Sequence, residues 1–410
     1  MDLQGDPPPC SRQAVYSNAM ALIEEIQAAL RAEGLGGWLF FDHHRRDPLA
    51  YRVLRFEPAQ SVTRRWYYLV PASGAPRKLV HRIEPRALDP LPGEATLYSG
   101  WRDTEERLPR LLEGCRRVAM QYSPRCGVPY VSLVDAGTVE LVRSCGVEVV
   151  TSANLIQLFE AVWTPQQYAS HKRAATLVDE IRRAAFARVA EALRAGARIT
   201  EYDLQQFIRN CFDQAGITTD HGPIVAVNSN ASNPHYEPQR DRHSAIKPGD
   251  LLLIDLWAKL DQPGAVFYDI TWTAYCGATP PEEMLNVFAA VAGARDAAVH
   301  CVQDAAAKGA GLAGFQVDDA CRDYLRERGF DEYFFHRTGH SIGAEVHGNG
   351  ANMDNYETHD ERRIIPGTCF SVEPGVYLPE FGVRSEVDVY RAESSAEVTG
   401  EIQTELLRLL

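Results

Sequence analysis

The sequence PGDLLLID at residues 248–255 is repeated in pattern by PGTCFSVE at residues 366–373. In both stretches a Pro-Gly pair opens an apolar run that ends in an acid 7 residues after the proline. A second acid follows the first after 14 residues in one case and after 13 in the other, so that the four acids are Asp255, Asp269, Glu373 and Glu386. An acid that closes an apolar strand is costly to desolvate unless a charge partner or a metal ion is there. The four acids therefore predict a metal centre.

The repeat extends into the helices that precede these strands. A long helix is predicted to end near Gly196 and a second one near Gly216, 20 residues later. The same pair recurs before the second set of acids, with ends near Gly309 and Gly329, again 20 residues apart. Two helices followed by paired acidic strands, twice over, predict a pseudo-twofold domain with its site where the halves meet.

The first 150 residues show a different pattern, in which strands and helices alternate. Helical periodicity covers 17–33, 103–113 and 130–144, and strands are predicted at 37–41, 66–70, 78–81, 117–120 and 147–150. This order is typical of an α/β domain. Thr164-Pro165 then opens a long amphipathic helix, with Thr164 as its cap. We expect two domains, 1–160 and 161–410.

Composition narrows the function classes. The 410 residues carry a net charge of -13, which argues against a large phosphate-binding face and so against nucleic acid as a partner. No apolar stretch approaches the roughly 20 residues that cross a bilayer, so we expect no membrane association and a cytoplasmic protein. The nine cysteines are scattered without Cys-x-x-Cys spacing, which predicts no thiolate zinc site.

Histidines complete the predicted site. His336, His340 and His347 fall within 12 residues, between the two pairs of acids. The inferred ligand set is Asp255, Asp269, His340, Glu373 and Glu386. Oxygen ligands with one nitrogen suit manganese, our first expectation, or zinc, cobalt or iron. Five ligands are too many for one open ion, whereas two ions about 3.5–4 Å apart, bridged by Asp269 and Glu386, use them all and hold a bridging hydroxide.

The order of these motifs resembles the pita-bread metallopeptidases, which include methionine aminopeptidase, aminopeptidase P and prolidase. The matching segments are Asp255, Asp269-Ile270-Thr271, Gly339-His340-Ser341-Ile342-Gly343, Glu373-Pro374-Gly375 and Arg384-Ser385-Glu386. The first domain resembles more loosely the N-terminal α/β domain of aminopeptidase P, prolidase and creatinase. The resemblance implies an α+β pita-bread catalytic domain, and it favours cleavage of Xaa-Pro peptide bonds in small peptides.

The resemblance also implies roles for single residues. Glu373 matches the proton acceptor, His347 the histidine that steadies the oxyanion, and His336 one assigned to proton transfer or substrate contact. His235 matches a histidine near the scissile bond. Thr271 is either a group that hydrogen-bonds the metal water or Asp269, or a plain β-branched strand residue. A homodimer, in which the N-terminal domain of one subunit reaches the site of its neighbour, is a further implication.

Two departures from the family pattern keep alternatives open. Asp261–Gly264 lengthens the turn between the first two acids, and His347 is followed by Gly348 where the family commonly has glutamate. The second departure weakens the expectation of proline specificity. The alternatives are a non-catalytic binding protein on the same fold and a metal-dependent lyase or amide hydrolase acting on a non-peptide substrate. Creatinase works without metal, so the five acid and histidine positions argue against it. The run at 43–46, His-His-Arg-Arg, is interpreted as a solvated loop rather than a second site.

Overall fold

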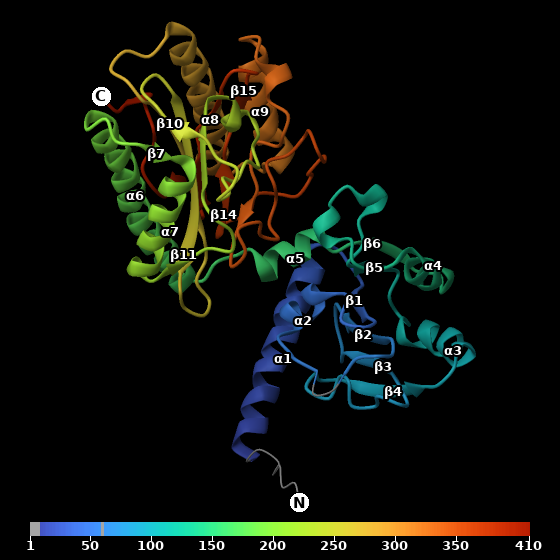
Figure 1. The fold of residues 1–410 in the computed structure, drawn as a ribbon. Helices are drawn as coiled ribbons and strands as arrows, with labels where there is room; N and C mark the ends of the chain where they lie inside the picture. The colour runs from blue at the N-terminus through green and yellow to red at the C-terminus, as the bar shows by residue number, and fades with distance from the viewer. Residues whose placement is uncertain (1–8, 59–60) are drawn as a thin grey trace, which may run out of the picture. The chain divides into compact units, whose positions relative to one another are not determined.

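The computed structural model describes residues 9–58 and 61–410. The chain divides into two compact units between Glu160 and Ala161. Figure 1 shows that each unit contains its own sheet structure and its own helices.

The first unit is built on a six-stranded mixed sheet in the order β4-β3-β2-β1-β5-β6. Its strands are β1 (Gly37–Asp42), β2 (Trp66–Pro71), β3 (Arg77–His81), β4 (Glu94–Tyr98), β5 (Arg117–Met120) and β6 (Glu148–Thr151). Successive residues of β1 point to opposite faces, as strand geometry requires. Trp38 and Phe40 pack with the helices α1 (Pro9–Ala32), α2 (Pro48–Leu54) and α5 (Ala153–Glu160). Leu39 and Phe41 pack with α3 (Trp101–Leu111) and α4 (Ala136–Ser144).

The predicted α/β class of this unit is confirmed, with four local corrections. The helix predicted at 130–144 begins only at Ala136, because the side chain of Asp135 caps it by accepting a hydrogen bond from the Thr138 backbone at 2.9 Å. Short 3-10 turns occupy Pro124–Cys126 and Pro129–Val131 instead. Strand β4 and helices α2 and α5 were not predicted; most of β4 is solvent-exposed, so its residues lack the apolar alternation of a half-buried strand.

The run at 43–46 lies in the loop between β1 and α2, as predicted. The carboxylate of Asp42 accepts hydrogen bonds from the backbone N–H groups of Arg45, Arg46 and Asp47 at 2.9, 2.7 and 3.0 Å. These bonds shape the loop, and His44, Arg45 and Arg46 are exposed.

The second unit contains two larger sheets. The first has the order β19-β12-β11-β8, with β9 also paired to β11, and the second has the order β13-β14-β17-β18. Two small pairs, β7 with β10 and β15 with β16, complete the strands. The bounds are β7 (Ile199–Thr200), β8 (Ile217–Thr218), β9 (Ile224–Val227), β10 (Ala245–Ile246), β11 (Leu251–Leu260), β12 (Tyr268–Tyr275), β13 (Ser341–Ile342), β14 (Thr368–Val372), β15 (Gly375–Tyr377), β16 (Gly382–Arg384), β17 (Val387–Arg391), β18 (Ala396–Val398) and β19 (Leu407–Arg408).

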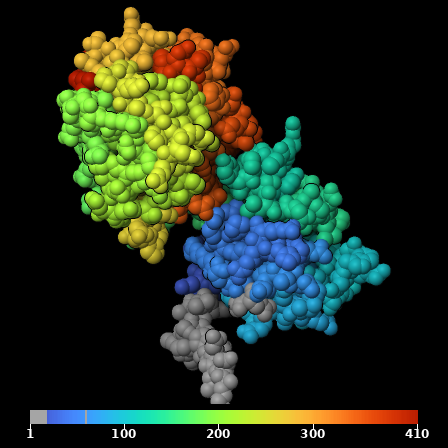
Figure 2. Space-filling view, viewed as in Figure 1, coloured from blue at the N-terminus to red at the C-terminus, as the bar shows by residue number. Residues whose placement is uncertain are grey.

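Each sheet of this unit has its own pair of helices. Helices α6 (Pro165–Arg194) and α7 (Glu201–Ala215) share a hydrophobic core with β11 and β12. Helices α8 (Glu282–Lys308) and α9 (Gly314–Arg326) share another with β14 and β17. Short 3-10 turns lie at Asn228–Ser232 (η3) and Asp331–Tyr333 (η4). In the space-filling view the green and yellow surface of the first half adjoins the orange and red surface of the second (Figure 2).

Local signals explain the helix ends of this repeat. Thr164 forms a capping box with Gln167 at the start of α6, as the Thr-Pro pair predicted. Helices α7 and α8 end at Gly216 and Gly309, each in the left-handed conformation that favours glycine. Helix α8 is long and apolar enough to cross a membrane by composition, but Val291, Ala294 and Ala298 are buried in the core. Its apolar face belongs to the core of the second half.

The strand that carries Asp255 differs from the prediction. Asp255 does not close its strand but lies in the middle of β11, which runs on to Leu260 and pairs Asp255 with Thr271. The lengthened turn at 261–264 closes this β11–β12 hairpin, with Gly264 at φ 78°. Glu373, by contrast, directly follows β14, as expected.

Candidate metal centre

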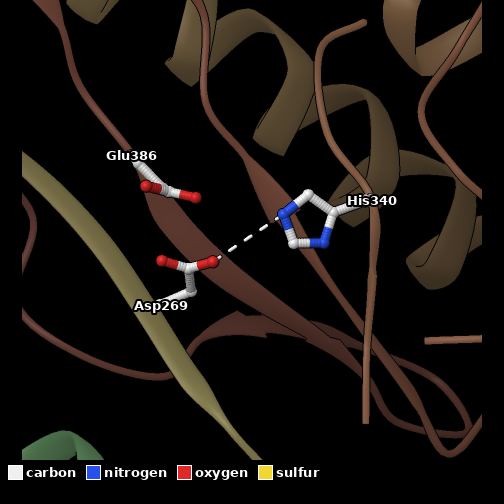
Figure 3. A group of neighbouring side chains, drawn as sticks. All are labelled: Asp269, His340 and Glu386. Carbon is white, nitrogen blue, oxygen red and sulfur yellow. Dashed lines mark ion pairs between the residues drawn. The ribbon is translucent and has the colours of Figure 1, made fainter. Parts of the chain in front are cut away.

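Three predicted ligands form one compact group. Asp269, His340 and Glu386 each bring a potential ligand atom to within 4.8 Å of the other two, and all three are buried. Figure 3 shows the two carboxylates side by side and the imidazole of His340 directed at Asp269, with His340 Nε2 3.7 Å from Asp269 Oδ2. Asp269 comes from the first half of the unit, and His340 and Glu386 come from the second.

Two hydrogen bonds donated by backbone N–H groups join the two halves at this point. Glu386 donates its N–H to the carbonyl of Thr271 on β12 at 3.1 Å. The N–H of Asp269 donates to the carboxylate of Asp388 on β17 at 2.9 Å. Strands β12 and β17 thereby hold the two carboxylates of the group in register across the junction between the sheets.

The other two acids of the predicted set lie beside this group. Oε1 of Glu373 is 3.4 Å from His340 Nε2 and accepts a hydrogen bond from Ser371 Oγ at 3.3 Å. Asp255 is paired through Oδ2 with the guanidinium of Arg384. The compact group contains neither acid, but both are linked to it, Glu373 through His340 and Asp255 through Arg384.

The charge state of the acids fits a bound cation. Burial, with the charge of Glu386 next, raises the pKa of Asp269 well above its ordinary value. Burial and the charge of Glu373 do the same for Glu386, and burial raises the pKa of Glu373 to about 7. Carboxylates this close cannot all ionise without a positive partner. Asp255 Oδ1 and Asp269 Oδ1 are buried without a hydrogen-bond partner. Buried oxygens are normally paired, so two unpaired oxygens at this site indicate that a cation binds there. The donor set therefore fits one or more divalent metal ions.

Arg384 is a central residue whose role the sequence did not reveal. Besides pairing with Asp255, it donates from Nε to Thr271 Oγ1 at 3.0 Å and from Nη1 to Tyr377 at 3.4 Å. Thr271 Oγ1 in turn donates to Glu386 Oε2 at 2.7 Å. Of the two readings of Thr271, the structure supports the hydrogen-bonding one, with Glu386 in place of the expected Asp269. The available signal for Arg384 was its place at the start of the Arg384-Ser385-Glu386 motif, two residues before a predicted ligand.

The predicted histidines occupy different surroundings. The ring of His347 meets that of His340 edge-on at 4.3 Å between centroids, while much of its surface stays exposed. His336 contacts Tyr377 Oη through Nε2 and the Arg337 carbonyl through Nδ1, both at 2.7 Å, and burial lowers its pKa to about 3. His235 is exposed in the stretch between η3 and β10. Burial raises the pKa of Asp255 and lowers the pKa of His347 to about 4.

Close packing accounts for the glycines that follow His347. The N–H of Gly348 donates to the Ser341 carbonyl at 2.6 Å, and that of Gly350 to Ser341 Oγ at 2.9 Å. A Cβ would lie 2.9 Å from Ser341 Oγ at Gly348 and 2.6 Å from it at Gly350. A glutamate directly after His347 would therefore collide with the residue next to His340.

The chain is similar in sequence to a known family of enzymes. The family model of metallopeptidase family M24 matches residues 169–393, more than half of the chain. The chain belongs to metallopeptidase family M24. It is 26% identical over 396 residues to a Mycobacterium tuberculosis protein named a probable dipeptidase, PepE, with 96% of each chain covered. It is 34% identical over 164 residues to the Xaa-Pro dipeptidase of Lactobacillus helveticus, covering 40% of each chain.

Coverage differs among the curated relatives of this M24 chain. The alignments span 48% and 57% of two Mycoplasma proteins named as Xaa-Pro aminopeptidases, so the chain matches about half the length of these relatives. Among solved structures, the dipeptidase PepE of Mycobacterium ulcerans has a TM-score of 0.65 at 23% identity, covering 95% of this chain and 98% of that one. A prolidase from Thermococcus sibiricus has a TM-score of 0.58 at 24% identity, covering 94% and 98%. These matches confirm the predicted fold, an N-terminal domain followed by a pita-bread domain.

Proposed function

We propose that this protein hydrolyses the peptide bond before proline in small peptides, with two divalent metal ions bound by Asp255, Asp269, His340, Glu373 and Glu386. The buried group of Asp269, His340 and Glu386, in a member of a metallopeptidase family, carries the proposal. Relatives named Xaa-Pro dipeptidase support the choice of substrate. The structure of a Caenorhabditis elegans X-prolyl aminopeptidase is described as having a di-nuclear active site, which supports the number of ions.

Side chains of this chain supply the proton transfers of the proposed reaction. Bound divalent ions lower the pKa of a coordinated water toward neutrality and polarise the scissile carbonyl. Glu373, within 3.4 Å of His340 Nε2, accepts the proton of the attacking water and passes it to the leaving nitrogen. His347, against the ring of His340, donates a hydrogen bond to the developing oxyanion. His336, held between Tyr377 and the Arg337 carbonyl, is fixed in orientation for substrate contact.

The test is cleavage by protein stripped of metal and reloaded with manganese, cobalt, zinc or iron in turn. Xaa-Pro dipeptides and Xaa-Pro-Yaa tripeptides form the panel, since the relatives include both dipeptidases and aminopeptidases. Metal-dependent cleavage before proline that is lost in Asp269→Asn supports the proposal. Asp261→Asn is the matched control, because this acid is exposed in the turn of the same hairpin.

Other outcomes identify the alternatives. Metal binding without cleavage of any peptide would favour a binding protein or a non-peptide substrate, and absence of metal binding would refute the site. Incorporation of oxygen from isotopically labelled water into the product separates hydrolysis from elimination by a lyase. Manganese as the native metal, a homodimer and a cytoplasmic location stay predictions, which metal analysis of the isolated protein, light scattering and cell fractionation would check.

A further inference from the structure

One buried carboxylate outside the metal centre has no part in the proposed reaction. Glu201 is the first residue of α7, and its relative exposure is 0%. Burying a carboxylate is costly unless several donors surround it. Thr200 already caps this helix by accepting a hydrogen bond from Asp203, so α7 does not need Glu201 for its own N-terminus.

All four hydrogen-bond donors to this carboxylate come from one stretch of chain. Oε1 accepts from the Val227 backbone at 2.8 Å and from Asn230 Nδ2 at 2.9 Å. Oε2 accepts from Tyr236 Oη and from the Ser244 backbone, both at 2.6 Å. The donors span the connection between β9 and β10, and this segment, 227–244, carries His235. The buried carboxylate of Glu201 thus holds the segment by four hydrogen bonds.

The opposite side of the segment packs against the β15–β16 hairpin, which ends next to the candidate metal centre. Ser232 Oγ donates to the Leu378 carbonyl, directly after β15. A Cβ at Gly382 would lie 2.1 Å from the Ala231 carbonyl oxygen, so η3 and β16 are in close contact. Strand β16 ends at Arg384, the partner of Asp255. The segment is therefore held between Glu201 on one side and the β15–β16 hairpin on the other.

We propose that Glu201 is a positioning residue, which holds Tyr236 and the 227–244 segment so that His235 is presented to the substrate. The inference rests on the proposed function, because it takes His235, which the family resemblance places near the scissile bond, to contact the substrate. Tyr236 transmits the constraint: its hydroxyl is bonded to Glu201, its ring packs against the cluster of Ala226, Ala231 and Leu253, and His235 is its neighbour in the chain.

The first experiment is a double-mutant cycle with Tyr236→Phe and His235→Ala, measured as kcat and KM on the best substrate of the panel. Tyr236→Phe removes one hydrogen bond and keeps the ring, so the protein should fold. Misplacing a substrate contact by about 1 Å can cost roughly 100-fold, so we expect a loss of about 10- to 100-fold in kcat/KM. In the background of His235→Ala the same change should cost less than about twofold, because neighbours that act as one unit are not additive.

The second experiment does not depend on activity. Hydrogen–deuterium exchange of Glu201→Gln should show faster exchange in 227–244, with bound metal unchanged. Asp203→Asn is the matched control, since it changes an exposed acid of the same helical turn that bonds only Thr200 in the described structure. Additive effects in the cycle, or unchanged exchange in Glu201→Gln, would overturn the proposal. If the wild-type protein cleaves no peptide, the proposed function fails, while the exchange experiment still decides whether Glu201 orders the segment.

Discussion

Replacing Thr271 by valine should weaken metal binding without emptying the site. Thr271 has a relative exposure of 0%, and its hydroxyl links Arg384 Nε at 3.0 Å to Glu386 Oε2 at 2.7 Å. Valine keeps the shape but removes both bonds, so a buried guanidinium N–H and a ligand oxygen lose their partner. A hydrogen bond to a charged group contributes about 1.5–3 kcal/mol.

The expected effect on metal affinity follows from this magnitude. Loss of a partner that orients a ligand typically costs about 10- to 100-fold in metal affinity, or about 1.4–2.8 kcal/mol. Equilibrium dialysis of Thr271→Val with manganese, followed by elemental analysis, should show one weakened class of site. At saturating metal the turnover should recover most of the wild-type value, because the ligands themselves remain.

Thr273→Val supplies the matched control for this variant. Thr273 lies two residues further along β12, is also 0% exposed, and donates its hydroxyl to the Arg384 carbonyl at 2.9 Å. This variant loses a neutral bond that does not involve a ligand, so it should lose about 1 kcal/mol of stability and keep its metal affinity. Equal loss of affinity in both variants, or none in Thr271→Val, would refute the role of Thr271 in orienting Glu386.

Three further predictions concern metal loading, a buried histidine and a crowded glycine. The acids of the metal-free site, with the pKa of Glu373 at about 7, bind protons more tightly when folded. Their contribution to stability is therefore lost as pH rises, and manganese should raise the melting temperature more at about pH 8 than at about pH 5, an effect that chelator should reverse. Burial lowers the pKa of His171 to about 4, so stability falls as pH drops from about 6.5 toward 4. The free energy of unfolding, measured with urea, should fall by about 2 kcal/mol more between pH 7 and pH 5 in the wild-type protein than in His171→Gln. Gly339→Ala should destabilise by about 3 kcal/mol or more in thermal melts, because its Cβ would lie 1.9 Å from the Ser371 carbonyl. Gly343→Ala, with 3.8 Å of clearance, should melt like wild type.

The sequence predicted those parts of the site that depend on local pattern. A strand that ends in an acid can be recognised from the order of residues alone, and so can the Gly-His-x-x-Gly motif around His340. The position of Asp255 was misjudged because the apolar run continues past it, through Leu256 to Leu260 in β11, and a strand buried on both faces shows no alternation that would mark its end.

Local sequence patterns could not predict contacts between residues that lie far apart in the chain. Arg384 and Asp255 are 129 residues apart, and His336 and Tyr377 are 41 apart. Arg384 meets Asp255 only where the β15–β16 hairpin of the second half packs on β11 of the first, and His336 meets Tyr377 only through the folding of the second half. The repeated acids and the histidines predicted the candidate ligands, and the family resemblance agreed with them, but neither supplied the hydrogen-bond network around these residues.

This network bears on how many metal ions the site is built for. Asp255 offers one oxygen to Arg384 and leaves the other without a hydrogen-bond partner, so it can keep its guanidinium and still bind a cation. The four acids of the proposed set carry four negative charges when ionised, and Arg384 returns one positive charge. A single divalent ion would leave one negative charge in a buried site, in addition to an unused ligand oxygen. Two ions would leave one positive charge, which the developing oxyanion of a peptide carbonyl can balance in the transition state. Charge balance therefore supports the proposed pair of ions, and Arg384 offsets one of the four negative charges whether or not metal is bound.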